Sequence, residues 1–127
     1  MARILVVDDE TGIITVLKEM LLRLHYEVLT AASGSEALDK LTLGGVDLVV
    51  TDIVMPDVDG LELISKIQSL YPHLKVIAIS GGGAQEGPEG YLRDAKELGA
   101  VRCLTKPFML KELAALVKEL LETELKR

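Results

Sequence analysis

At 127 residues the chain has the length of one domain, and its 49% hydrophobic and 27% charged residues exclude a disordered chain. The formal net charge of −6 argues against a nucleic-acid-binding surface, which requires clustered Lys and Arg. No apolar run approaches the roughly 20 residues of a membrane span, so we expect contact with neither nucleic acid nor a membrane.

Five short stretches are predicted to be strands. Three of them are continuous apolar runs rich in β-branched residues, which is typical of strands buried on both faces of a sheet. The second and the last stretch have a weaker strand pattern. In chain order, the predicted strands cover residues 4–7, 27–31, 48–50, 76–79 and 102–105.

A helical pattern follows each predicted strand. Apolar residues recur at helix spacing in the first and the last of these segments. Ser33 followed by Glu36 predicts a capping box at the start of the second helix, and Gly44 predicts its end. In chain order, the predicted helices cover residues 13–24, 33–44, 61–70, 89–98 and 113–122.

The alternation of strand and helix predicts βα units with right-handed crossovers. Five such units make an α/β fold of the doubly wound class, in which helices cover both faces of a five-stranded parallel sheet. Ligands bind such sheets outside the carboxyl ends of the strands, where the strand order reverses. We therefore expect the functional residues at that edge.

The chain shows no linker or low-complexity run that would divide it, so we expect a single domain spanning residues 1–127. Its single cysteine, Cys103, excludes an internal disulfide and fits a reducing compartment. A strand is predicted almost at the first residue, so we expect no signal peptide. These features together predict a cytoplasmic protein.

Polar residues follow four of the five predicted strands. Asp8 and Asp9 follow the first, Asp52 the third, Ser80 the fourth and Lys106 the fifth. If the strands of this doubly wound sheet have the order 2-1-3-4-5, the first and third strands are neighbours and the three aspartates converge. Three carboxylates suit a hard cation such as Mg²⁺, which prefers oxygen ligands.

A carboxylate can also act as a nucleophile toward phosphorus and form an aspartyl phosphate. Phosphoryl transfer needs alignment and positive charge around the phosphoryl oxygens, which Mg²⁺ and Lys106 would supply. Ser80 could donate a hydrogen bond to the same group. Asp52 is the expected nucleophile, because it stands between the acid pair and the side of Ser80 and Lys106.

Four motifs resemble the signatures of the response-regulator receiver domain of bacterial two-component signalling: ILVVDDE, DLVVTDIVMPDVDGLEL, VIAISG and LTKPF. The resemblance covers essentially the whole chain and implies a flavodoxin-like fold. It implies that Asp52 accepts a phosphoryl group from a histidine kinase or a phosphotransfer protein, and that this event switches protein–protein interactions with a downstream target. It also implies a signalling phosphoacceptor that promotes only its own phosphorylation and dephosphorylation, rather than an enzyme.

The resemblance further assigns roles within the site. Mg²⁺, with Mn²⁺ as a possible substitute, would bind Asp8, Asp9, Asp52 and the backbone carbonyl of Val54. Ser80 would sense the phosphoryl group and Lys106 would pair with it. The peptide bond between Lys106 and Pro107 would be cis.

Three positions depart from the family's pattern. Cys103 occupies the place of a common aromatic residue, three positions before Lys106. Val54 and Gly82 replace side chains that are often polar, so neither can hold or block an attacking water. No output module is expected within this chain.

Two other functions are alternatives to a phosphoacceptor receiver. A haloacid-dehalogenase-type phosphatase also uses an aspartate nucleophile with Mg²⁺, but it needs Asp-x-Asp after its first strand and a larger body, so it is excluded. The alternative that stays open is a degenerate receiver, a phosphorylation-independent protein-interaction module. Such proteins usually lack an acid, the phosphoacceptor or the lysine, and this sequence retains all of them.

Overall fold

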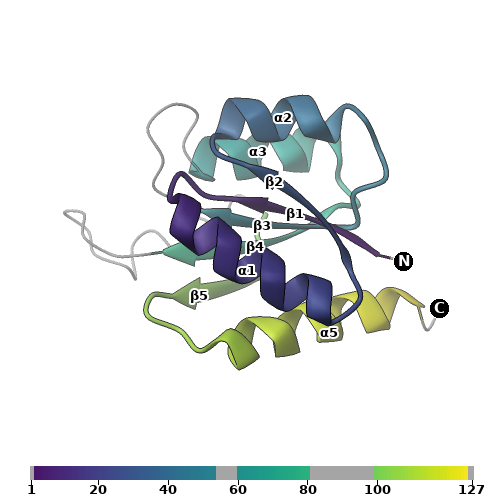
Figure 1. Ribbon diagram of the computed structural model, residues 1–127. Helices are drawn as coiled ribbons and strands as arrows, with labels where there is room; N and C mark the ends of the chain where they lie inside the picture. Colours follow the sequence, from purple (N-terminus) through teal and green to yellow (C-terminus); the bar gives the residue numbers. More distant parts are fainter. Residues whose placement is uncertain (1, 54–59, 81–98, 126–127) are drawn as a thin grey trace.

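The computed structural model describes residues 2–53, 60–80 and 99–125. Within them, five strands form one parallel sheet in the order β2-β1-β3-β4-β5, as predicted. The neighbours in space differ from the neighbours in sequence because the chain crosses from β2 over β1 to β3 (Figure 1). The strands are β1 (Arg3–Val7), β2 (Glu27–Ala31), β3 (Leu48–Asp52), β4 (Lys75–Ser80) and β5 (Arg102–Thr105).

Helices cover both faces of this sheet, α2 and α3 on one face and α1 and α5 on the other (Figure 1). Each pair of helices closes its own cluster of buried apolar side chains against the sheet. The described residues contain four helices: α1 (Thr11–Arg23), α2 (Gly34–Leu41), α3 (Gly60–Leu70) and α5 (Leu110–Leu125). The helix expected over residues 89–98 lies outside the described residues.

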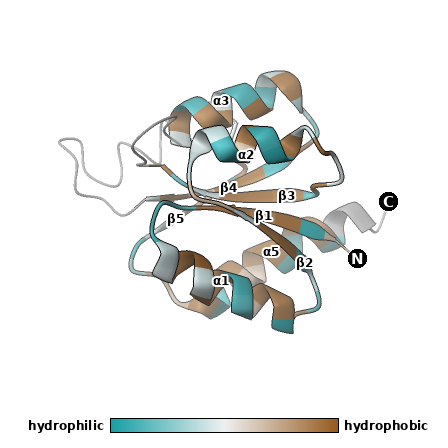
Figure 2. Cartoon of the chain, turned by 45° about the horizontal axis from the view of Figure 1, so that its top comes forward, coloured by the Kyte–Doolittle hydropathy of each residue, from teal (hydrophilic) through white to brown (hydrophobic). Residues whose placement is uncertain are grey.

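The central strands have more continuous apolar sequences than the strands at the edges of the sheet. Strands β1, β3 and β4 lie inside the sheet, and their residues are almost all buried. Strands β2 and β5 lie at its edges and are only partly buried, so their sequences need fewer apolar residues. Figure 2 shows the apolar strands enclosed between helices that carry both polar and apolar residues.

Local signals explain where the helices begin and end. The N-cap of α2 is Ser33, as predicted, and its Oγ accepts a hydrogen bond from the backbone N–H of Glu36 at 3.1 Å. Gly44 adopts a positive φ of 77° just after α2, where glycine is favoured. The last helix was predicted to end near Glu122, but it continues to Leu125 because no Gly or Pro interrupts it there.

Strand register aligns the carboxyl ends of the central strands. Val7 of β1 pairs with Thr51 of β3, Asp52 pairs with Ile79 of β4, and Ser80 pairs with Thr105 of β5. The residues that follow these pairs therefore emerge side by side at one edge of the sheet. None of the helices in the described part of the chain is long and apolar enough to cross a membrane.

Candidate functional site

The end of β1 supplies two aspartates in different environments. The backbone N–H of Asp8 donates to the carbonyl of Ala31 at 3.1 Å, which extends the pairing with β2 by one residue and holds Asp8 in place. The Asp8 side chain is buried, and its Oδ1 accepts a hydrogen bond from the backbone N–H of Glu10 at 2.9 Å. Asp9 is exposed. The end of β1 thus carries one buried carboxylate, Asp8, and one exposed carboxylate, Asp9.

The ends of β3 and β4 supply the next two residues. Asp52 is the last residue of β3 and is only 6% exposed, and Ser80 is the last residue of β4 and is fully buried. The backbone N–H of Ile53 donates to the carbonyl of Ile79 at 3.0 Å, which keeps the two strands paired up to their ends. The backbone of Asp52 is therefore held by strand pairing at the carboxyl edge of the sheet.

Lys106 follows β5 and reaches across β4 toward the acids. Its backbone N–H donates to the carbonyl of Ser80 at 2.8 Å. Its Nζ lies 3.4 Å from Oδ2 of Asp52 and 3.6 Å from Oδ2 of Asp8. The peptide bond between Lys106 and Pro107 is cis, as the resemblance implied. One ammonium group is thus shared between two buried carboxylates.

Burial perturbs the titration of both sides of this cluster. Burial raises the pKa of Asp8 to about 6, and the Asp52 carboxylate adds to the rise, although the Glu10 N–H and the Lys106 ammonium oppose it. For Lys106, burial favours the neutral form, but the nearby Asp52 and Asp8 carboxylates outweigh it and raise the pKa. The lysine therefore stays protonated. Its single positive charge does not balance the negative charges of the neighbouring carboxylates.

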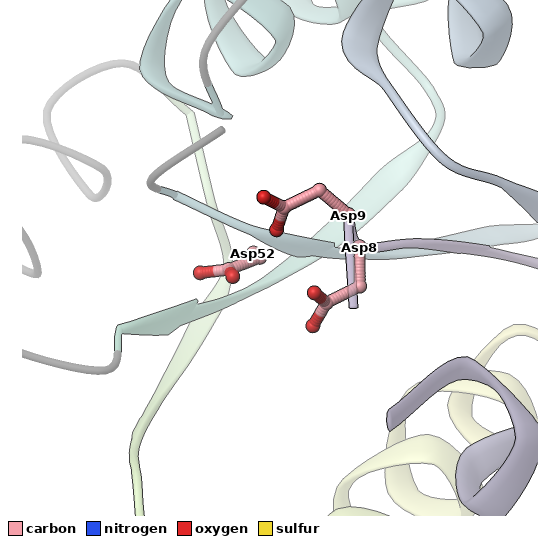
Figure 3. A group of neighbouring side chains, drawn as sticks. All are labelled: Asp8, Asp9 and Asp52. Carbon is pink, nitrogen blue, oxygen red and sulfur yellow. The ribbon is translucent and has the colours of Figure 1, made fainter. Parts of the chain in front are cut away.

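The three aspartates have the arrangement that a divalent cation requires. Asp8, Asp9 and Asp52 each offer one oxygen, and these oxygens all lie within 4.8 Å of one another. Figure 3 shows the three side chains, which come from the ends of two neighbouring strands. Mg²⁺ takes oxygen ligands at about 2.0–2.1 Å, and a raised carboxyl pKa indicates that a further positive charge would be favourable here. The residues present therefore fit Mg²⁺.

The structure brings together most of the residues that the sequence singled out. Asp8, Asp9, Asp52 and Lys106 form one cluster, and Ser80 ends the strand between Asp52 and Lys106. Val54 and Gly82 lie outside the described residues. The roles that the resemblance assigns to these residues remain predictions.

Sequence reasoning missed two residues that contact the backbone of Asp52. Gly60, the residue just before the helix predicted over residues 61–70, packs against the end of β3. Thr51 donates a hydrogen bond from Oγ1 to the Asp52 carbonyl at 2.9 Å. The available signals were a glycine at the start of a helix and a polar residue within a buried apolar strand.

An apolar hollow of about 530 Å³ adjoins the site and is lined in part by Lys106. Val16 of α1 is 48% exposed and Leu110 of α5 is 40% exposed, so the wall of the hollow carries apolar side chains that are open to solvent. An apolar surface thus lies beside the carboxylate cluster, on the side of Lys106. Its other lining residues are Ile13, Leu17, Pro107 and Phe108.

Comparison with known families identifies the same pattern over most of the chain. The family described as "Response regulator receiver domain" matches residues 4–118. The chain is 42% identical over 122 residues to the DNA-binding transcriptional regulator NtrC of Azospirillum brasilense, but it spans only 24% of that protein. It is 34% identical over 119 residues to sporulation initiation phosphotransferase F of Bacillus subtilis and spans 93% of that protein.

Solved structures show the same fold. A CheY-like response regulator receiver domain protein from Methanospirillum hungatei JF-1 has a TM-score of 0.89 and 34% identity, with 100% of this chain and 99% of that one covered. The response regulator protein TrrA from Thermotoga maritima, in complex with Mg²⁺ and BeF, has a TM-score of 0.82 and 39% identity. There the match covers 94% of this chain and 99% of that one.

Proposed function

The chain belongs to the response regulator receiver domain family, the phosphoacceptor domains of two-component signal transduction, and we propose that Asp52 is its phosphoacceptor. The observation that carries this proposal is the position of Asp52. Its carboxylate is buried at the carboxyl end of a central strand, 3.4 Å from the Lys106 ammonium and within the cluster of three aspartates. Asp8 also lies near this lysine, but its Oδ1 accepts the Glu10 N–H, whereas Asp52 ends the strand that lies between the β1 aspartates and the side of Ser80 and Lys106.

The proposed reaction uses the Asp52 carboxylate as the nucleophile. One of its oxygens forms a bond to the phosphorus of the donor, and the bond between phosphorus and the donor's histidine nitrogen breaks. The nitrogen keeps the electron pair, and the product is an aspartyl phosphate. Lys106, already held between Asp52 and Asp8, pairs with a phosphoryl oxygen, and the Ser80 hydroxyl donates to another.

Asp8, Asp9 and Asp52, with the carbonyl of Val54, would hold Mg²⁺ or, in its place, Mn²⁺. When bound, the ion supplies the positive charge that screens the incoming phosphoryl group from the carboxylates. Asp9 is the exposed member of the set, so it is the proposed first contact for a cation arriving from solvent. Asp8 keeps its carboxylate aligned through the hydrogen bond from Glu10.

The proposed donor is a histidine kinase or a phosphotransfer protein, and the domain promotes its own phosphorylation and dephosphorylation rather than turning over a substrate. The hollow that borders Lys106 favours a protein donor, because exposed apolar side chains lie directly beside the acceptor edge. Residues 1–127 would act as one cytoplasmic receiver domain that passes its signal to a target protein without contacting nucleic acid.

The degenerate receiver, which would act without phosphorylation, is not favoured. A domain that no longer accepts phosphoryl groups has no need to keep two buried carboxylates beside a lysine, since buried charges are costly. All of the acids, the acceptor and the lysine are retained here.

Incubation with acetyl phosphate tests this function. The chain should gain one phosphoryl group by intact-mass measurement when Mg²⁺ is present, and none when EDTA removes the metal. Substitution Asp9→Ala should lower the rate of labelling at limiting Mg²⁺ and recover at high Mg²⁺. Labelling at an equal rate with and without metal would contradict the proposed role of the aspartates.

A further inference from the structure

The first residue of α3 lies directly against the end of the acceptor strand. The backbone N–H of Gly60 donates to the carbonyl of Ile53 at 2.7 Å, and Gly60 is buried. A Cβ at this position would lie 2.2 Å from the carbonyl oxygen of Asp52 and 2.4 Å from the Cα of Ile53. Both are backbone atoms that no rotamer change can move, so only glycine permits this contact.

A second group holds the same carbonyl oxygen. Thr51 is fully buried, and its Oγ1 donates a hydrogen bond to the carbonyl of Asp52 at 2.9 Å. On the following residue, the backbone N–H of Ile53 donates to the carbonyl of Ile79 at 3.0 Å. The peptide unit between Asp52 and Ile53 is therefore fixed through its oxygen, its nitrogen and its contact with Gly60.

We infer that Gly60 and Thr51 are positioning residues for phosphoryl transfer, which hold the Asp52 backbone so that its carboxylate faces Lys106 and the other aspartates. The inference rests on the proposed function of Asp52. In aspartate a single methylene group separates the carboxylate from the backbone. A shift of the peptide unit therefore moves the attacking oxygen as well. Phosphoryl transfer depends on alignment, and a misplacement of about 1 Å can slow such a reaction about 100-fold.

Gly60→Ala tests the contact, and Gly12→Ala is its matched control. Gly12 lies in the first turn of α1, also just after an acidic strand end, but a Cβ there meets nothing within 4 Å. With acetyl phosphate and saturating Mg²⁺, we expect Gly60→Ala to be labelled about 10- to 100-fold more slowly than wild type. Gly12→Ala should stay within about twofold of wild type. Urea unfolding of each variant identifies the conditions in which it is fully folded, and rates are compared there.

Thr51 provides an independent test, which holds even if Gly60→Ala does not fold. Thr51→Val keeps the shape of the side chain but removes its donor, and Thr51→Ser keeps the hydroxyl. We expect labelling of folded Thr51→Val to slow about tenfold and Thr51→Ser to recover to within about twofold of wild type. A purely structural role would lower stability without changing the rate of the folded protein.

Wild-type labelling rates in folded Gly60→Ala and Thr51→Val would overturn the inference and leave the proposed function intact. A Thr51→Ser variant as slow as Thr51→Val would also overturn the role of the hydroxyl. Failure of wild type and Gly12→Ala to be labelled at all would instead contradict the proposed function itself, and the inference with it.

Discussion

Asp8 shows how strongly burial changes the chemistry of a single residue in this domain. Its carboxyl is 2% exposed, shares one lysine with Asp52 and has a pKa of about 6 instead of 3.8. The sequence placed Asp8 correctly at the end of a strand, because an apolar run followed by acids marks such an end. It could not predict which aspartate of the pair is buried, since that depends on the pairing of Asp8 with Ala31 of β2.

The raised pKa of Asp8 predicts a dependence of stability on pH. Between about pH 4 and 6 the folded state binds more protons at Asp8 than the unfolded state does, so the free energy of unfolding decreases as pH rises through that window. In metal-free buffer, the free energy of unfolding of Asp8→Asn relative to that of wild type should therefore increase as pH rises. The difference should grow by an amount on the order of 2–3 kcal/mol and level off above about pH 6.

Urea unfolding of wild type and Asp8→Asn from pH 4 to 8 measures this difference. The matched control is Asp39→Asn, which removes an exposed aspartate of α2. A stability difference between wild type and Asp8→Asn that does not change with pH would contradict the account of Asp8.

Among the secondary-structure elements, the buried strands could be predicted best from the sequence, and the ends of the helices could be predicted least well. Strand β1 was predicted within one residue because parallel strands inside a sheet must be apolar throughout. The end of α5 was misjudged, since the residues after Glu122 are compatible with a helix and no stop signal follows them. The packing of α3 on β3 could not be predicted, because it depends on where the helix is placed relative to the sheet.

The N-cap of α2 allows a prediction at this scale. Ser33→Ala removes the hydrogen bond from the Glu36 N–H to the Ser33 hydroxyl, so it should lower the free energy of unfolding by about 1 kcal/mol. Ser35→Ala, an exposed position in the same helix, is the control and should change stability little. Urea unfolding measures both variants, and equal stabilities would show that the cap contributes nothing. Labelling by acetyl phosphate should be unchanged in either variant.

At the scale of the whole molecule, the site exists only because the strand order brings distant residues to one edge. Asp8 and Lys106 lie 98 residues apart in a sequence of 127, but their charged groups lie 3.6 Å apart in space. Sequence reasoning could predict this meeting because parallel βα topology fixes which strand ends are neighbours. It could not predict the hollow beside Lys106, because that surface depends on how α1 and the start of α5 leave side chains uncovered.

The hollow predicts a difference between protein and small-molecule donors. Val16→Asp places a charge on its apolar wall, so it should slow phosphoryl transfer from a histidine kinase that phosphorylates the wild-type chain. Labelling by acetyl phosphate, which needs no docking surface, should stay at the wild-type rate.

The control for this experiment is Leu22→Asp, because Leu22 lies on the same helix with nearly equal exposure, 47% against 48%, and does not line the hollow. Equal slowing of kinase transfer in both variants would contradict a docking role for the hollow. So would a loss of acetyl phosphate labelling in Val16→Asp alone.

The central claim is that Asp52 accepts the phosphoryl group, and intact-mass measurement after treatment with acetyl phosphate and Mg²⁺ tests it most directly. Wild type and the exposed-site control Asp39→Asn should each gain one phosphoryl group. Asp52→Asn should gain none, because its amide cannot act as the nucleophile while the rest of the cluster remains. Full labelling of a folded Asp52→Asn variant would contradict the assignment.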